Sequence, residues 1–233
     1  MASLNFSALA VTAVFALGGY FLRGVSRSGA VAGCVLAYAI YACAGPRAFV
    51  MLVALFVLTF LATRLGRRRK VALGTAERSD GRSASQVLAN VGVASLFAIG
   101  YGHFGHASWL AGCAAALAEA AADTVSSECG QVFGAPTRLL TTGGRVPVGT
   151  NGGISLAGTL SGTLAAIGMA LAAALAGLVD GRGRWVVAAA AVIGMFVDSL
   201  FGAVFEGPGW LNNDAVNFLG TLSAALLACW WAR

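Results

Sequence analysis

Two aspartates in the second half of the chain interrupt apolar segments, and each is followed by the same short pattern. Asp123 precedes Asn151 and Asp198 precedes Asn213, and after six further residues each asparagine leads into Gly-Thr-Leu-Ser. A carboxylate is costly inside a bilayer, so an acid within an apolar segment indicates a functional site. The repeated pattern therefore predicts where the chemistry takes place. The alternative is chance similarity within a composition rich in alanine, glycine and leucine.

The chain contains only nine carboxylates. Glu77, Asp80 and Asp180 are expected in loops away from the repeated pattern. The other six are Glu119, Asp123, Glu128, Asp198, Glu206 and Asp214. Hard oxygen ligands of this kind suit Mg2+, which proteins hold with one or two carboxylates plus substrate phosphates. We take the three aspartates among these six as candidate catalytic residues, and the same three with Glu128 as candidate metal ligands. The alternative is hydrogen bonding to Asn, Ser and Thr inside the membrane.

Part of this acidic set is predicted to share one side of a helix. Glu119, Asp123 and Ser127 recur every four residues, which places them on one helix face. Glu128 stands just before Gly130, where we expect that helix to end.

Between the two repeated copies lies a segment, residues 130–162, that is rich in glycine and small hydroxyl residues. Glycines let backbone N–H groups approach an anion closely, and the start of the next helix adds a favourable dipole. The predicted phosphate-binding residues are Arg138, Arg145, Gly149, Thr150, Asn151, Gly152, Gly153, Asn213 and Asn217. The segment is not a P-loop, because no Gly-Lys-Ser/Thr follows it. The alternative is a tight re-entrant turn in which Gly158 and Gly162 only permit close helix packing.

The composition excludes an ordinary soluble domain. Of the 233 residues, 58% are hydrophobic and 10% charged, and the mean hydropathy is +0.82, whereas soluble domains are about 25% charged. We expect an all-α polytopic membrane protein whose first apolar segment is retained rather than cleaved. The five cysteines are odd in number and scattered, so we expect neither a zinc site nor a disulfide framework.

A span needs about 20 apolar residues, and we predict about eight of them. They lie near residues 3–22, 28–45, 47–65, 84–101, 107–129, 152–179, 185–205 and 213–231. We treat residues 1–233 as one membrane domain, with N-terminal helices and a basic loop in 1–101 and a catalytic repeat in 107–233. Both copies of the repeat would run in the same direction, so their aspartates could face each other across a pseudo-two-fold axis.

The distribution of basic residues predicts the orientation in the membrane. Basic residues concentrate in cytoplasmic loops, and an N-out, C-out chain puts eleven of its fifteen there. The four left outside are Arg47, Arg182, Arg184 and Arg233. All the repeat's acids then fall at cytoplasmic helix ends. Residues 64–70 with Arg78 and Arg82 are predicted to form a basic loop that would attract anionic headgroups or a nucleotide. The alternative is that these charges only reflect the positive-inside topology.

Four segments carry a resemblance to a known family. They are DTVSSECGQVFG, RLLTTGGRVPVGTNGGISLAGTLSG, FVDSLFGAVFE and NDAVNFLGTLSAALLA. The chain closely resembles an integral-membrane family, first catalogued as of unknown function, that includes transmembrane protein 19 and the phytyl-phosphate kinases of tocopherol biosynthesis. The stretch from Asp123 to Gly130 also resembles, more distantly, the dolichol and phytol kinases that take phosphate from CTP.

The resemblance implies a kinase that acts on a lipid phosphate, with CTP above all as the nucleoside triphosphate. Together with the acidic residues and the predicted orientation, we expect it to use Mg2+ and to lie in the bacterial cytoplasmic membrane. Its acceptor would be an isoprenoid monophosphate, such as phytyl phosphate, whose apolar tail enters sideways from the bilayer between helices. Its partners would be these substrates and membrane lipids, with no nucleic acid. Two alternatives remain open: a transporter of an anion or a lipid phosphate, and a CTP-dependent nucleotidyltransferase, which would release pyrophosphate.

Overall fold

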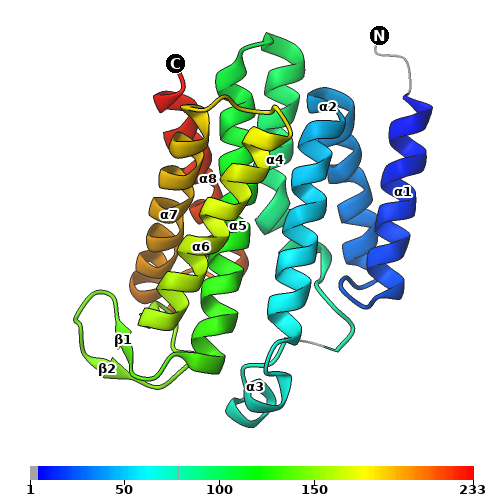
Figure 1. Ribbon diagram of the computed structural model, residues 1–233. Coiled ribbons are helices and arrows are strands. Elements are labelled where there is room, and N and C mark those ends of the chain that lie inside the picture. Colours follow the sequence, from blue (N-terminus) through cyan, green and yellow to red (C-terminus); the bar gives the residue numbers. More distant parts are fainter. Residues whose placement is uncertain (1–4, 78) are drawn as a thin grey trace.

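The apolar segments form long helices that lie side by side, with a short helix and a small sheet at one end of the bundle (Figure 1). The computed structural model describes residues 5–77 and 79–233. The helices are α1 (Phe6–Phe21), α2 (Arg27–Arg64), α3 (Arg67–Leu73), α4 (Ala84–Phe104), α5 (Ala107–Phe133), α6 (Leu156–Leu175), α7 (Gly183–Phe201) and α8 (Asn213–Trp231). The strands are β1 (Thr137–Leu139), β2 (Arg145–Val146) and β3 (Gly153–Ile154). A π-helical turn, Gly202–Glu206, extends α7.

Small polar residues start most of these helices, because their side chains accept hydrogen bonds from the free N–H groups of the first turn. Ser26 caps α2, Ser155 caps α6 and Asn212 caps α8. At α4, Ser83 and Gln86 form a reciprocal capping box. Each of these caps lies just before an apolar run, so the sequence marks these helix starts locally.

Helix α2 is one element that doubles back on itself. Gly45 adopts φ 82° and ψ 178°, which is not helical, and Pro46 follows it. The first leg starts where Ser26 N donates to Arg82 O at 2.9 Å, and the second ends where Arg64 Nη2 donates to Leu22 O at 2.7 Å. Both ends of α2 therefore lie at one end of the bundle. The two legs match the separate segments predicted at 28–45 and 47–65.

Helix α5 occupies the centre of the bundle and contacts α2, α4, α6, α7 and α8. Residues 111–122 are buried, and eight of these twelve are alanine. Small side chains let neighbouring helix backbones come close, which is how helices associate in membranes. The sequence of α5 therefore builds the core and carries its acids into the middle of the fold.

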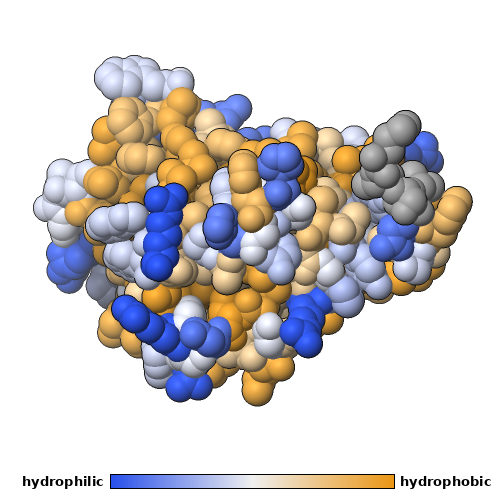
Figure 2. All heavy atoms as spheres, turned by 90° about the horizontal axis from the view of Figure 1, so that it is seen from above, coloured by the Kyte–Doolittle hydropathy of each residue, from blue (hydrophilic) through white to orange (hydrophobic). Residues whose placement is uncertain are grey.

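The outer faces of the helices are apolar. Phe6, Leu156, Leu164 and Leu175 expose between 69% and 89% of their surface. Figure 2 looks onto the end at which the C-terminus lies, where hydrophilic side chains form separate patches with hydrophobic ones between and around them. So much exposed apolar surface is unfavourable in water and indicates contact with another apolar phase.

Among the described residues, four segments are long and apolar enough to cross a membrane: α2, α4, α6 and α7 with its π-helical turn. Helix α1 is apolar but shorter. The chain is thus a helical membrane protein, while the count of eight spans, the parallel repeat and the boundaries of 1–101 and 107–233 stay predictions.

Two expectations are corrected. Helix α5 does not end near Gly130 but continues to Phe133, because one glycine does not stop a helix that is packed on its neighbours. The expected all-α class also needs an addition, since part of the glycine-rich segment forms an antiparallel sheet of order β2-β1-β3. In this sheet Arg138 pairs with Arg145 on one side and with Ile154 on the other.

Candidate functional site

A polar cavity of about 260 Å³ lies at the end of the bundle that carries the sheet. Its walls come from the start of α4, the last turns of α5, the glycine-rich segment, the end of α7 and the start of α8. The predicted site residues that line it are Asp123, Glu128, Gly149, Thr150, Asn151, Gly152, Gly153, Asp198, Asn213 and Asn217. Most of the predicted site residues are therefore brought together, although they are spread over about 95 positions from Asp123 to Asn217.

Asp123 of α5 and Asp198 of α7 form the acidic part of this cavity. The carboxylates of Asp123 and Glu206 lie close enough to Asp198 to repel it electrostatically. Asp198 Oδ2 is buried and accepts no hydrogen bond within the described structure. A buried charge with neither partner nor solvent is costly, so this wall of the cavity is suited to a cation.

Glu119 lies one turn before Asp123 on α5 and close to both aspartates. It is 1% exposed, and its Oε1 also has no hydrogen-bond partner among the described residues. Two glycines of neighbouring helices make room for it. A Cβ on Gly194 would stand 2.7 Å from Glu119 Cγ, and one on Gly220 would stand 2.7 Å from Glu119 Oε1 and 3.1 Å from Asp198 Oδ2.

The glycine of the repeated pattern has the same packing role in both copies. Gly220 brings α8 against α7 at Asp198, and Gly158 brings α6 against α5, where an added Cβ would lie 2.8 Å from Ser126 O. The serines of the pattern bond within their own helices: Ser161 Oγ donates to Ala157 O and Ser223 Oγ to Leu219 O. The pattern therefore sets helix distance beside each acid rather than supplying free hydroxyl groups.

The glycine-rich segment reaches the acids through one tight turn. Gly152 has φ 72°, and an added Cβ would collide with the backbone and side chain of Ala203 in the π-helical turn that follows α7. Gly153 N donates to Thr150 O at 2.9 Å, which closes the turn. Only glycine fits this left-handed position without strain, and the turn thereby presses residues 149–153 against the helix end that carries Asp198 and Glu206.

Glu128 is engaged in an ion pair that the sequence did not predict. Lys70 Nζ donates to Glu128 Oε2 at 2.6 Å, and to the carbonyls of Ala62 and Thr63. We had expected Lys70 in a basic surface loop, but its side chain is 1% exposed and therefore buried. Its long stem lets it fold back from α3 into the bundle, where three acceptors satisfy its three N–H donors. The ion pair satisfies one Glu128 oxygen and weakens the case for Glu128 as a metal ligand.

The cavity lining contains residues that were not predicted as site residues, among them Glu77, Arg82, Gln86 and Asn90. Glu77 was expected in a loop away from the repeated pattern. Instead it lines this cavity, where Gln86 Nε2 donates to its Oε1 at 3.2 Å. Arg82 Nη2 donates to Thr124 Oγ1 at 3.2 Å, and its charge acts on Asp123. A sequence feature could have pointed to this part of the site: Gln86 and Asn90 are polar residues inside an otherwise apolar segment.

Three predicted site residues lie outside the cavity lining: Arg138, Arg145 and Asp214. The two arginines are exposed on the small sheet, and Arg138 Nη1 donates to Gly143 O at 2.7 Å. Asp214 lies in the first turn of α8, where a negative charge stabilises the helix dipole. Their predicted phosphate-binding, catalytic and metal roles receive no support from this placement.

The residues present fit Mg2+ bound together with a phosphate. Within residues 5–77 and 79–233, no group of three or more His, Cys, Asp or Glu side chains is arranged to hold a metal ion alone. Mg2+ commonly uses one or two carboxylates, with water and substrate phosphate completing its shell. Asp123 and Asp198, with the unpartnered Oδ2, meet that requirement.

Long apolar helices around a cavity lined with acids define a helical membrane protein with a buried polar site. The chain belongs to the family described as "Integral membrane protein DUF92", whose model matches residues 10–225. No solved structure matches the chain significantly.

Three relatives cover most of the chain. It is 33% identical over 226 residues to "Protein VTE6, chloroplastic" of Arabidopsis thaliana, covering 92% of this chain and 68% of that protein. It is 34% identical over 199 residues to "Uncharacterized membrane protein sll0875" of Synechocystis sp., covering 83% and 77%. It is 34% identical over 209 residues to "Uncharacterized membrane protein MJ0933" of Methanocaldococcus jannaschii, covering 88% and 84%. Each match covers between 83% and 92% of this chain.

Proposed function

We propose that this protein is a kinase that transfers the γ-phosphoryl group of a nucleoside triphosphate, CTP in our assignment, to an isoprenoid monophosphate such as phytyl phosphate. The P–O bond between the β- and γ-phosphates breaks, a bond forms from the γ-phosphorus to a phosphate oxygen of the acceptor, and the nucleoside diphosphate leaves. The product is the isoprenoid diphosphate. The resemblance to phytyl-phosphate kinases supports the acceptor class, and the likeness to dolichol and phytol kinases supports CTP.

One observation carries the proposal: Asp123, Asp198 and the turn at residues 149–153 converge on a single polar cavity. Phosphoryl transfer depends on positioning and on neutralising phosphate charge, and needs little further chemistry from the protein. An acceptor that is already a phosphate needs no strong general base. This agrees with a cavity lining that contains no histidine among the described residues.

In this proposal Asp123 and Asp198 would hold Mg2+, and the turn at residues 149–153 would lie against the nucleotide phosphates. Its free backbone N–H groups would bind them, but not those of Thr150 and Gly153, which donate to Pro147 O and Thr150 O within the loop. When bound, Mg2+ would neutralise charge on the phosphates and orient them. Asn151, Asn213 and Asn217 would fix the geometry by hydrogen bonds. Arg82, held at Thr124 and acting on Asp123, supplies a positive charge in the same cavity.

We further propose that the chain crosses the bacterial cytoplasmic membrane eight times, with both termini outside and the cavity facing the cytoplasm. The two legs of α2 would count as separate spans. Nucleoside triphosphates and Mg2+ are cytoplasmic, so the orientation and the kinase activity depend on each other. The bias of basic residues toward the end of the bundle that carries the cavity supports this orientation.

The proposal is tested by giving the purified protein CTP, Mg2+ and a panel of isoprenoid monophosphates, and identifying the nucleotide product. We expect CDP in amounts equal to the lipid diphosphate. Pyrophosphate with a cytidylylated lipid would identify a nucleotidyltransferase. Neither product, together with movement of a lipid phosphate or an anion across a vesicle membrane, would identify a transporter.

A further inference from the structure

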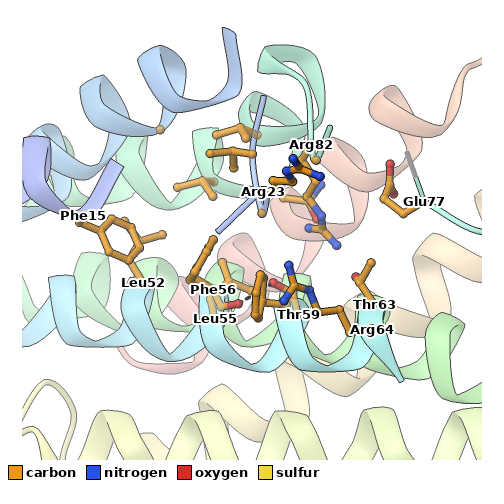
Figure 3. A pocket seen from close by; sticks show the side chains of 18 of the residues that line it. Phe15, Arg23, Leu52, Leu55, Phe56, Thr59, Thr63, Arg64, Glu77 and Arg82 are labelled. Carbon is orange, nitrogen blue, oxygen red and sulfur yellow. Dashed lines mark hydrogen bonds between the residues drawn. The ribbon is translucent and has the colours of Figure 1, made fainter. Parts of the chain in front are cut away.

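A second and larger cavity, of about 530 Å³, lies between α1, both legs of α2 and α4. Its volume falls within the range of roughly 300–1,000 Å³ that is typical of small-molecule sites. Figure 3 shows its two parts: Phe15, Leu52, Leu55 and Phe56 at one end, and Arg23, Arg64 and Arg82 gathered at the other. The cavity is therefore amphipathic along its length.

The apolar part is a wall of aromatic and aliphatic side chains. The ring of Phe56 packs edge-on against Phe15, with centroids 5.5 Å apart, and stacks with Phe60 at 5.6 Å. The cavity lining follows the second leg of α2 from Leu52, in the apolar wall, to Arg64, at the arginine end, and these two residues are twelve positions or about 18 Å of helix apart. Such a wall is suited to an extended hydrocarbon chain.

The arginine end of the cavity is built by contacts between two loops. Val25 and Arg82 form an isolated parallel bridge, Ser26 N donates to Arg82 O, and Arg82 N donates to Gly24 O at 3.1 Å. Gly81 permits this approach, because a Cβ there would stand 2.6 Å from Val25 N. The loop after α1 and the loop before α4 thus hold Arg23 and Arg82 beside each other.

Arg64 completes the cluster from the third side. Its guanidinium lies 3.9 Å from the centre of the Phe60 ring and its Nη2 donates to Leu22 O at 2.7 Å. Arg23 is the non-glycine residue with a positive φ, 57°, among those the structure describes. That conformation is unfavourable for an L-residue, and strain of this kind concentrates at ligand sites.

The two cavities share a wall. Glu77, Arg82 and Asn90 line both of them. Arg82 faces the arginine cluster on one side, and its Nη2 reaches Thr124, next to Asp123, on the other. A phosphate bound by Arg23, Arg64 and Arg82 would therefore stand at the border of the cavity that holds the acids.

We propose that this second cavity binds the isoprenoid phosphate acceptor, with its monophosphate on Arg23, Arg64 and Arg82 and its tail along Phe15, Leu52 and Phe56. The inference rests on the proposed kinase function for the identity of the ligand. Charge complementarity favours a phosphate as the head group of the ligand, because guanidinium groups pair with phosphate oxygens in bidentate fashion. The acceptor and the nucleotide then approach the shared wall from opposite sides.

The test uses the purified full chain and a C20 isoprenyl monophosphate that carries a photoactivatable diazirine in its tail. We expect crosslinks on the second leg of α2 and on α1, around Leu52, Leu55, Phe56 and Phe15. Unlabelled isoprenyl monophosphate should compete, and phosphatidylglycerol in excess should not. Equal competition by phosphatidylglycerol would overturn the assignment in favour of an ordinary membrane lipid.

A matched pair of variants tests the arginine cluster. Arg23→Gln should weaken binding of the probe about tenfold, because one hydrogen-bonded charge is lost. Arg68→Gln removes the same charge from α3, outside the lining of both cavities, and should leave binding unchanged. Arg23→Gly removes the charge and relieves the positive φ, so it should bind as weakly as Arg23→Gln while staying folded. Wild-type affinity in both Arg23 variants would overturn the inference.

The outcomes separate this inference from the proposed function. Crosslinks on α6 or α7 in a protein that forms CDP would reject the acceptor site and keep the kinase. Crosslinks on α1 and α2 in a protein that forms no CDP would keep the lipid site and reject the kinase.

Discussion

At the scale of single residues, the site depends on charges that the fold buries together. Asp123, Asp198 and Glu206 repel one another in one cavity, and among the described residues Arg82 is the only arginine in its lining. Asp198 Oδ2 has no protein partner in the described part of the chain. An arrangement of this kind is unfavourable on its own and becomes favourable when a cation binds. The acids are therefore better explained by ligand binding than by stability.

The first prediction concerns these acids. Asp123→Asn and Asp198→Asn should each lower kcat at least about 100-fold, as loss of one electrostatic group does elsewhere, and should leave the thermal midpoint equal or higher. Asp180→Asn is the matched control, because Asp180 Oδ1 caps Gly183 N in the loop after α6 and Asn caps equally well. Wild-type turnover in either of the two site variants would remove the carboxylates from the mechanism.

The second prediction concerns the ion pair of Lys70 and Glu128. Removing one member leaves an unpaired buried charge, so Lys70→Met and Glu128→Gln should each destabilise the protein by about 3–5 kcal/mol. The double variant should recover much of this loss. Chemical unfolding in detergent measures the three variants. A double variant as unstable as the sum of the single ones would show that the two residues act independently.

At the scale of elements, the glycine-rich segment connects the small sheet to the helix ends. Its sheet holds Arg138 and Arg145 outside, while the turn at residues 149–153 reaches in and contacts the π-helical turn after α7. Activity should therefore depend on how closely this turn packs on the π-helical turn at Gly202–Glu206.

The third prediction compares two glycines of this segment. Gly152 and Gly143 both have a positive φ, 72° and 68°, but a Cβ collides with Ala203 only at Gly152 and meets nothing within 4 Å at Gly143. Alanine costs both positions about 1–2 kcal/mol of backbone strain. Gly152→Ala should in addition displace the turn and raise the KM for nucleotide severalfold. Equal KM values in the two variants would contradict the role of this contact.

Much of this could be predicted from local sequence, and the failures have clear physical causes. Lone acids in apolar segments marked Asp123 and Asp198, and polar caps marked the helix starts. Contacts between residues far apart in the chain could not be predicted from local sequence. Nothing near Lys70 says that its stem folds back to Glu128, and nothing near Arg82 says that a loop contact with Val25 carries it to the border of two cavities. Composition also does not say which side of a turn faces the cavity, and both arginines of the sheet lie outside its lining.

At the scale of the whole molecule, the two ends of the bundle differ. The sheet and α3 lie at one end, and the C-terminus lies at the other (Figure 1). The residues that line the polar cavity belong to the end with the sheet. The arginine cluster of the second cavity lies at the same end as α3. Both substrates of the proposed reaction would thus meet at one membrane surface, with the lipid tail reaching back along α1 and α2.

The fourth prediction is the orientation. On a cysteine-free background, a cysteine at Thr141 should react with an impermeant thiol reagent only from the cytoplasmic side, and one at Gly181 only from outside. Both positions suit the test, since Thr141 is exposed and a Cβ at Gly181 meets nothing within 4 Å. Labelling of position 141 from outside would reject the orientation and, with it, a kinase that uses cytoplasmic nucleotide.

The central claim is most directly tested by following the γ-phosphate itself. Purified protein is given Mg2+, an isoprenyl monophosphate and CTP labelled with phosphorus-32 at either the γ- or the α-position. The account predicts that γ-label appears in the lipid diphosphate, that α-label stays in CDP, and that Asp198→Asn abolishes the transfer. Label from the α-position in the lipid, or no label in the lipid from either position, would contradict it.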